Sequence, residues 1–328
     1  MKTLKDFSKL KNDVNIILLK LSNILKEDSE NPFESEYDIS KIQEKLNSAT
    51  FKVLIIGEFS NGKSTFINAI LSNKILPTAT TETTATINVI KYGTLEKAII
   101  NYWGQKNERG EEVNNGRTQE IKINELSNFT ALTSASNEIA QKIKYIDVYY
   151  PSKYCENGIE LVDTPGLNTT YEFHELSTLE FLPNGHAGIF LLNATAFLSN
   201  SESIYLNTFR RYMTKFLFVA NRVDEMNLVD DDPLDFYKIE YWPKKLQKVL
   251  ESNETPKIYT MNSKLAESGN WKESGMSEFT QDLESFLASS DKAKEMIRPV
   301  INQSLEIINL EISKTNSSDT YFSISIEV

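Results

Sequence analysis

Residues 52–70 read KVLIIGEFSNGKSTFINAI, and this stretch decides the fold. An apolar run that predicts a strand over 52–56 leads into a glycine-bounded loop, and an apolar stripe at helical spacing follows. The loop fits the pattern G-x-x-x-x-G-K-[ST] of a phosphate-binding P-loop with Gly57, Gly62, Lys63 and Ser64. Glycine lets the backbone approach an anion closely, and the start of the following helix directs its amides at the phosphates. The sequence therefore predicts a nucleoside triphosphate site.

The residues of this loop have separate expected roles. Its backbone amides would surround the α and β phosphates, Lys63 would reach the β and γ oxygens, and the Ser64 hydroxyl would bind Mg²⁺. The catalytic candidates are Ser60 and Lys63, together with Thr84 further along the chain. The nucleotide-binding candidates in the loop are Gly57, Glu58, Phe59, Ser60, Asn61, Gly62, Lys63, Ser64 and Thr65.

The amino-acid composition is that of a soluble globular protein, and the net charge limits the kinds of partner that we expect. The chain has 328 residues, 40% of them hydrophobic, which is enough for one large core or two smaller ones. A net charge of -11 repels phosphate backbones and anionic lipid, so nucleic acid is not expected as a partner. Cys155 is the only cysteine, which excludes an internal disulfide and suits a reducing cytosol. We expect neither a secretory segment nor a membrane-spanning one.

Helical patterns lie on both sides of the P-loop region. One seam of apolar residues, at 3-4-3-4-3 spacing, comprises Phe7, Leu10, Val14, Ile17, Leu21 and Ile24. A second seam comprises Ile301, Leu305, Ile308 and Ile312. A short helix after the first would carry Ile39, Ile42 and Leu46. Such seams require partner helices, so we expect the two chain ends to pack together in one bundle.

Between the helical regions, predicted strands alternate with helices. The strand candidates are 52–56, 86–90, 98–103, 120–123, 143–149, a run ending at Asp163, 187–193, 216–221 and 257–261. This alternation predicts an α/β fold with a mostly parallel sheet covered by helices on both faces. We expect bundle helices at 1–49, a nucleotide-binding domain at 50–290, a bundle helix at 291–314 and a tail at 315–328.

Two further motifs follow apolar strands. In D-T-P-G, Asp163 would hold Mg²⁺ mainly through water, and the amide of Gly166 would contact the γ phosphate. In N-R-V-D, the candidates are Asn221, Arg222 and Asp224. The Asp224 carboxylate can accept hydrogen bonds from N1 and N2 of guanine, whereas adenine offers no such pair of donors. The sequence therefore favours GTP and GDP as ligands and disfavours an ATPase.

A threonine-rich run, LPTATTETTAT, supplies the switch candidate. Thr84 would bind Mg²⁺ through its hydroxyl and the γ phosphate through its amide, with Thr83 as the alternative. After the strand at 257–261, Asn262, Ser263 and Lys264 would make backbone contacts to the guanine O6, a plain loop being the alternative.

The stretches GEFSNGKST, LPTATTETTAT, DTPGLN and NRVD, in this order, resemble the bacterial branch of the dynamin family of large GTPases. The resemblance covers residues 50–290 and implies a G domain that dimerises across the nucleotide and is activated by its partner. It also implies a helical bundle, with Pro299 in the region of a hinge. The departures are Phe59 where eukaryotic dynamins have glutamine, and Arg222 in place of lysine. The family's long stalk and lipid-binding tip would follow where the chain ends.

Two functional hypotheses result. The first is a GTPase whose turnover is stimulated by homodimerisation across the nucleotide face and coupled to movement of the bundle, acting in membrane remodelling with a missing or partner-supplied stalk. Leu167 stands where small GTPases orient water with glutamine, so a lone monomer should be slow. The second is a slow GTP-dependent switch that docks a longer dynamin-like partner. Both predict a cytoplasmic location with indirect membrane contact, or a peripheral one at the inner face of the cell membrane.

Overall fold

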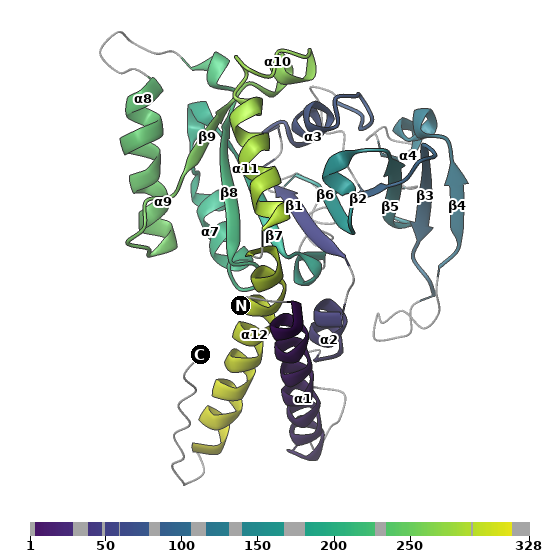
Figure 1. Cartoon of the computed structure of the whole chain (residues 1–328), viewed down its shortest axis with the longest axis vertical. Helices are drawn as coiled ribbons and strands as arrows, with labels where there is room; N and C mark the ends of the chain where they lie inside the picture. The colour runs from purple at the N-terminus through teal and green to yellow at the C-terminus, as the bar shows by residue number, and fades with distance from the viewer. Residues whose placement is uncertain are drawn as a thin grey trace.

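A computed structural model describes residues 4–28, 39–47, 50–58, 60–78, 86–105, 116–130, 140–166, 181–226, 234–289 and 291–316. Within these ranges, a nine-stranded sheet with helices on both faces stands on a helical bundle (Figure 1). The predicted α/β fold class is confirmed. Each strand candidate is also a strand of the structure, and its bounds differ by two residues or fewer.

The P-loop strand lies inside the sheet, whose order is β4-β3-β5-β2-β6-β1-β7-β8-β9. The strands are β1 Phe51–Ile56, β2 Asn88–Tyr92, β3 Lys97–Tyr102, β4 Thr118–Ile121, β5 Ile143–Tyr150, β6 Ile159–Asp163, β7 Ala187–Asn193, β8 Lys215–Asn221 and β9 Ile258–Met261. Strands β6, β1, β7, β8 and β9 are parallel neighbours. Their carboxyl ends therefore meet at one edge, and the three sequence motifs lie in the loops that follow β1, β6 and β8.

Helices cover the two faces of the sheet. They are α3 Lys63–Leu71, α4 Ser127–Thr130, α7 Asn200–Phe209, α8 Leu234–Phe236, α9 Trp242–Leu250, α10 Ser263–Glu267 and α11 Met276–Ala288, with a π-helical turn, η6 Tyr237–Tyr241, before α9. Short 3-10 turns are η1 Ile123–Glu125, η2 Lys153–Cys155, η3 Leu182–Asn184, η4 Ala194–Ala196 and η5 Val223–Glu225. Because strand residues alternate sides, Val53 and Ile55 of β1 pack with α3 and α11, whereas Leu54 and Ile56 pack with α7 and α9.

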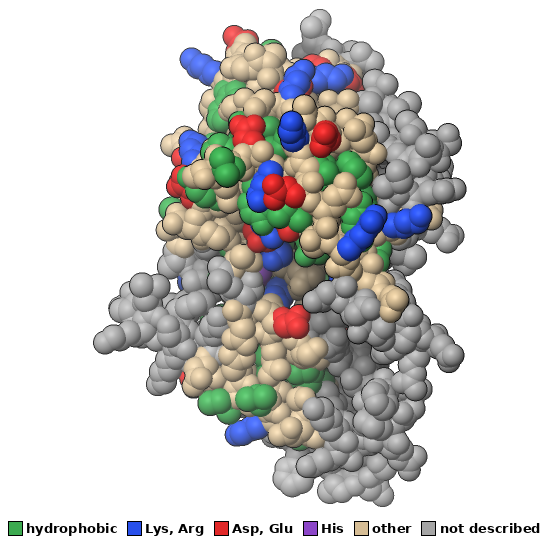
Figure 2. All heavy atoms as spheres, turned by 90° about the vertical axis from the view of Figure 1, so that its right-hand side faces the viewer, with side chains coloured by type: hydrophobic (Ala, Val, Ile, Leu, Met, Phe, Trp, Pro, Cys, Tyr) green, Lys and Arg blue, Asp and Glu red, His purple; other side chains and the backbone are tan. Residues whose placement is uncertain are grey.

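The far edge of the sheet ends in β4, which is largely exposed. Figure 2 faces this side and shows lysine, arginine and acidic side chains interspersed with hydrophobic ones. One ion pair there joins Lys97 of β3 to Glu120 of β4 at 2.7 Å. Charged side chains on an edge strand disfavour pairing with the strand of another molecule.

Segments from both ends of the chain form the bundle, as the sequence predicted. Its helices are α1 Leu4–Asp28, α2 Ile39–Asn47 and α12 Asp291–Asn316, which lie side by side (Figure 1). The buried core of the bundle comprises Val14, Leu18, Leu21, Ile39, Ile42, Leu46, Ile297, Val300 and Ile307. Ile301 and Ile308 pack against this core and are partly buried.

The predicted seam of α1 was wrong in part. Ile17 and Ile24 are 45% and 51% exposed, whereas Leu18, which the predicted spacing omits, is fully buried. The four consecutive residues Ile16 to Leu19 are apolar and point to all sides of the helix, so spacing alone does not select the buried side. In α12, Ile307 is buried where Leu305 was expected, and Leu305 lines a shallow surface groove. The side chains of Phe7 and Leu10 lie outside the described residues.

Helix α12 is continuous through Pro299, which is buried. The break between the last helix that covers the sheet and the bundle helix lies earlier in the chain, because α11 ends at Ala288 and α12 begins at Asp291. The hinge role of Pro299 and the domain bounds stay predictions. In the ranges that the structure describes, no helix combines the length and apolarity that crossing a bilayer requires.

Candidate nucleotide-binding site

The P-loop connects β1 to α3 at the carboxyl edge of the sheet. Gly62 precedes the helix with a φ of 86°, a left-handed conformation that favours glycine. A Cβ at Gly57 would lie 2.4 Å from the carbonyl oxygen of Leu191, and one at Gly62 would lie 2.7 Å from Nδ2 of Asn221. The close packing of the loop against β7 and β8 therefore requires glycine at both positions. This reason is separate from the close approach of an anion to the backbone.

Lys63 folds back over the loop. Its Nζ donates hydrogen bonds to the carbonyl oxygens of Gly57 at 3.0 Å and Glu58 at 3.1 Å. Burial lowers the pKa of Lys63 to about 8, although nearby Asp163, Glu202 and Glu58 oppose this shift. The ammonium group is therefore held by two neutral acceptors, which anionic phosphate oxygens can replace with stronger charge-assisted bonds.

Ser64 and Asp163 meet in front of the loop. The hydroxyl of Ser64 donates to Oδ2 of Asp163 at 3.0 Å, because β6 is paired with β1 so that Asp163 lies beside Ile55. Burial raises the pKa of Asp163 to about 6, against the opposing effects of Lys63 and Ser64. Its Oδ1 is buried and makes no hydrogen bond of normal geometry to the described residues. A hydroxyl and a carboxylate are ligands that suit Mg²⁺.

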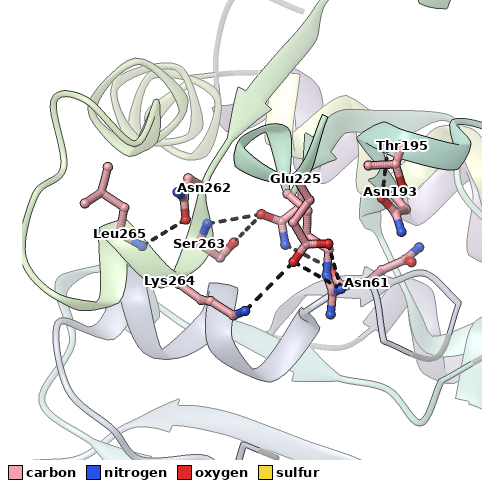
Figure 3. A network of polar contacts seen from close by, with 10 residues as sticks. Asn61, Asn193, Thr195, Glu225, Asn262, Ser263, Lys264 and Leu265 are labelled. Carbon is pink, nitrogen blue, oxygen red and sulfur yellow. Dashed lines mark hydrogen bonds and ion pairs between the residues drawn. The ribbon is translucent and has the colours of Figure 1, made fainter. Parts of the chain in front are cut away.

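Asn221 joins the phosphate side of the site to the base side. Its Nδ2 donates to the carbonyl oxygen of Asn61 at 2.7 Å. Its Oδ1 accepts from the amide of Ser263 at 3.1 Å and from the Ser263 hydroxyl at 2.8 Å (Figure 3). This one side chain therefore ties together the P-loop, the end of β8 and the start of α10.

The residues expected around the base lie beside this junction. Asp224 is exposed on η5, two residues after Arg222. Arg222 has a φ of 64° and forms an ion pair of 3.1 Å with Glu225, which also lies 3.9 Å from Nζ of Lys264. Oδ1 of Asn262 accepts from the amide of Leu265 at 3.0 Å and so caps α10 (Figure 3).

The structure brings together many, but not all, of the predicted residues. Ser60 is exposed at the turn of the P-loop with a φ of 68°, Thr65 lies in the first turn of α3, and Gly166 follows β6. Phe59, Thr83, Thr84 and Leu167 lie outside the described residues.

The sequence did not predict a set of contacts between the P-loop and the start of α7. Side chains at the start of α7 hydrogen-bond to Glu58 and Asn61; they are Ser199, Ser201 and Glu202. The spacing S-x-x-E at 199–202 is the signature of a capping box and identifies the start of a helix. Nothing in that spacing indicates contact with a loop about 140 residues away.

A P-loop, a D-x-x-G motif and an N-x-x-D motif at one edge of a mostly parallel sheet define the fold of a GTPase G domain. Residues 53–223 match the model of the dynamin family, and the chain belongs to this family. Membership confirms the resemblance inferred from the four motifs and indicates a GTPase domain.

Two similar proteins are bacterial. The chain is 29% identical over 225 residues to a bacterial dynamin-like protein of Nostoc punctiforme, covering 66% of this chain and 31% of the relative. It is 28% identical over 333 residues to dynamin-like protein 1 of Campylobacter jejuni, covering 89% and 44%. The chain thus spans less than half the length of these relatives.

A solved structure supports the same fold. It is an oligomerised bacterial dynamin pair, described as providing a mechanism for the long-range sensing and tethering of membranes. The TM-score is 0.57 at 23% sequence identity, over 95% of this chain and 47% of the other.

Proposed function

We propose that this chain binds GTP at the P-loop edge of the sheet and hydrolyses it to GDP and phosphate. The observation that best supports the proposal is the Asn221 junction, which ties the phosphate-binding loop to α10 beside the exposed Asp224. A site that fixes phosphates and base relative to one another is what selective binding of one nucleotide requires.

On the phosphate side, the amides of 60–65 would surround the α and β phosphates, and Lys63 would exchange its two carbonyl acceptors for β and γ oxygens. Ser64 and Asp163 would hold Mg²⁺, which when bound neutralises charge on the phosphate oxygens. Thr84 would add a hydroxyl to the metal and an amide to the γ phosphate, and Gly166 a second amide. Ser60 is the remaining catalytic candidate.

On the base side, Asp224 would accept from the N1 and N2 donors of guanine. Burial of an unpaired carboxylate against adenine would be unfavourable, so discrimination of up to about 10⁴-fold is the expected scale. Arg222 would lie over the base, and the backbone of Asn262 and Ser263 would contact O6.

Stimulation by assembly is the second part of the proposal. Phe59 and Leu167 leave no glutamine at either position that would orient water, so a second copy across the nucleotide face would complete the site. The oligomerised state of the bacterial dynamin pair with this fold is consistent with self-association. We further propose that turnover moves the bundle relative to the G domain in membrane remodelling, from a cytoplasmic or peripheral membrane location.

One observation favours the slow switch that docks a longer dynamin-like partner. Helix α1 carries apolar side chains that the described residues leave about half exposed: Ile16, Ile17, Leu19 and Ile24, at 44–55%. Such a stripe is the kind of surface that a partner helix covers.

Turnover as a function of protein concentration separates the two accounts. The GTPase account predicts that the rate per molecule rises steeply with concentration and reaches a plateau, because the active species is a dimer. A low rate that is independent of concentration, with tight GTP binding, would instead support the switch.

A further inference from the structure

Helix α7 begins against the P-loop. Its N-cap residue, Ser199, donates its hydroxyl to Oε1 of Glu58 at 2.8 Å, and the hydroxyl of Ser201 donates to the same oxygen. At the next residue, Oε1 of Glu202 accepts from Nδ2 of Asn61 at 2.9 Å. The first turn of one helix thus holds two side chains of the phosphate-binding loop.

Both oxygens of Glu202 are in use. Oε1 binds Asn61, and Oε2 accepts from the amide of Ser199 at 2.9 Å, which closes the capping box. The residue is 1% exposed, and burial together with nearby Glu58 raises its pKa to about 7. A glutamine would suffice for the capping box alone. The second oxygen of Glu202 binds Nδ2 of Asn61, which also donates to the carbonyl oxygen of Leu191 at 2.9 Å.

The contact with Asn61 extends across the loop. The carbonyl oxygen of Asn61 accepts from Asn221, which in turn accepts from Ser263. A continuous chain of hydrogen bonds therefore runs from Glu202 through the P-loop to the base side of the site. Displacement of Glu202 would be transmitted to both halves of a bound nucleotide.

The other end of α7 is held by the bundle. In the turn after the helix, the carbonyl oxygen of Tyr212 accepts from Nζ of Lys45 in α2 at 2.9 Å, and that of Arg211 accepts from Gln303 in α12 at 3.3 Å. The hydroxyl of Thr214 donates to Glu295 of α12. Three side chains from two bundle helices thus bind one short segment, at the end of the sheet opposite α10 (Figure 1).

We propose that α7 positions the P-loop, with Glu202 as the positioning residue, and that the bundle adjusts this position through the far end of the helix. The helix is 10 residues long, which corresponds to about 15 Å. Rigid elements of this kind carry coupling between sites, and coupling of binding energies is reciprocal. The inference rests on the proposed function, because it concerns the affinity for guanine nucleotides at this site.

The first test is Glu202→Gln, measured by calorimetric titration with GDP. Asn61 and the Ser199 amide donate to different oxygens of Glu202. In glutamine one of these oxygens becomes an NH₂ group, which would face a donor, so the affinity should fall about tenfold or more. The matched control is Glu240→Gln, at an exposed carboxylate paired only with Lys244 among the ion pairs described, which should change affinity by less than about twofold. A lower melting temperature with wild-type GDP affinity would show that Glu202 is only a helix cap, and would overturn the proposal.

The second test concerns the bundle end. Lys45→Met, far from the nucleotide, should change GDP affinity by about threefold or more, and should have no further effect when combined with Glu202→Gln. The control is Lys20→Met, on an exposed position of α1. If Lys45→Met does not fold, Gln303→Ala tests the same junction. Unchanged affinity in the variant that folds would overturn the coupling to the bundle.

Failure of the proposed function can be distinguished from failure of the positioning role of Glu202. If the wild-type chain binds neither GDP nor GTP, the proposed function is wrong. If it binds them and Glu202→Gln binds equally well, only the positioning role of Glu202 is wrong.

Discussion

Lys45 gives a prediction whose magnitude follows from the structure. Its side chain is 3% exposed, and burial lowers its pKa from 10.5 to about 7. Because the unfolded chain binds the proton more tightly between these two values, the stability of the folded protein should rise with pH across this window. Between about pH 7 and pH 9 the contribution from this one group is about 2 kcal/mol.

The perturbation is Lys45→Met, which keeps the length of the side chain and removes the titrating group. Urea unfolding, followed by far-UV circular dichroism, would be measured for both proteins at the two pH values. Other titrating groups cancel in the difference between the proteins, so the wild type should gain about 2 kcal/mol relative to the variant. Lys20→Met should retain the full wild-type gain, since Lys20 is exposed. Equal gains in the wild type and Lys45→Met would refute the reasoning, because Lys45 would then stay charged at this junction.

Three further predictions concern the site and the bundle. Lys63→Ala should abolish tight GTP binding without loss of the fold, because it removes the cation from the β and γ phosphates; unchanged affinity in a calorimetric titration would rule out the P-loop assignment. Thr84→Ala should leave GDP binding nearly unchanged and strongly reduce turnover, because its contacts need the γ phosphate; a larger effect of Thr83→Ala would move the role by one residue. Leu18→Ala should destabilise the bundle by about 2–5 kcal/mol in urea unfolding and Ile17→Ala by less than about 1 kcal/mol, and similar costs would mean that α1 packs through another face.

The strands and the motif positions could be predicted because their signals are local. Buried strands read as apolar runs, and the P-loop, D-T-P-G and N-R-V-D are each defined within eight residues or fewer of contiguous sequence. The helical region at 234–250 was not predicted. There Ile239 and Tyr241 are exposed, and a π-helical turn places the packed side chains Tyr237 and Trp242 five residues apart, which breaks the period of 3.6.

Contacts between distant segments are the part that sequence could not supply. Leu18, rather than Ile17, is buried because α2 and α12 pack on that side of α1, and this depends on three segments meeting in space. Glu202 reads as a helix cap in sequence. Its second role arises because α7 follows β7 and begins beside the loop that follows β1, its neighbour in the sheet.

The central claim is that this edge of the sheet binds guanine nucleotides through Asp224, and the substitution Asp224→Asn tests it most directly. An amide at this position can donate to the oxygen that replaces the amino group of guanine in xanthine. In calorimetric titrations, the wild type should bind GDP and reject XDP, whereas the variant should bind XDP in preference to GDP. If the variant keeps the wild-type preference, Asp224 does not read the base and the assignment of the site is wrong.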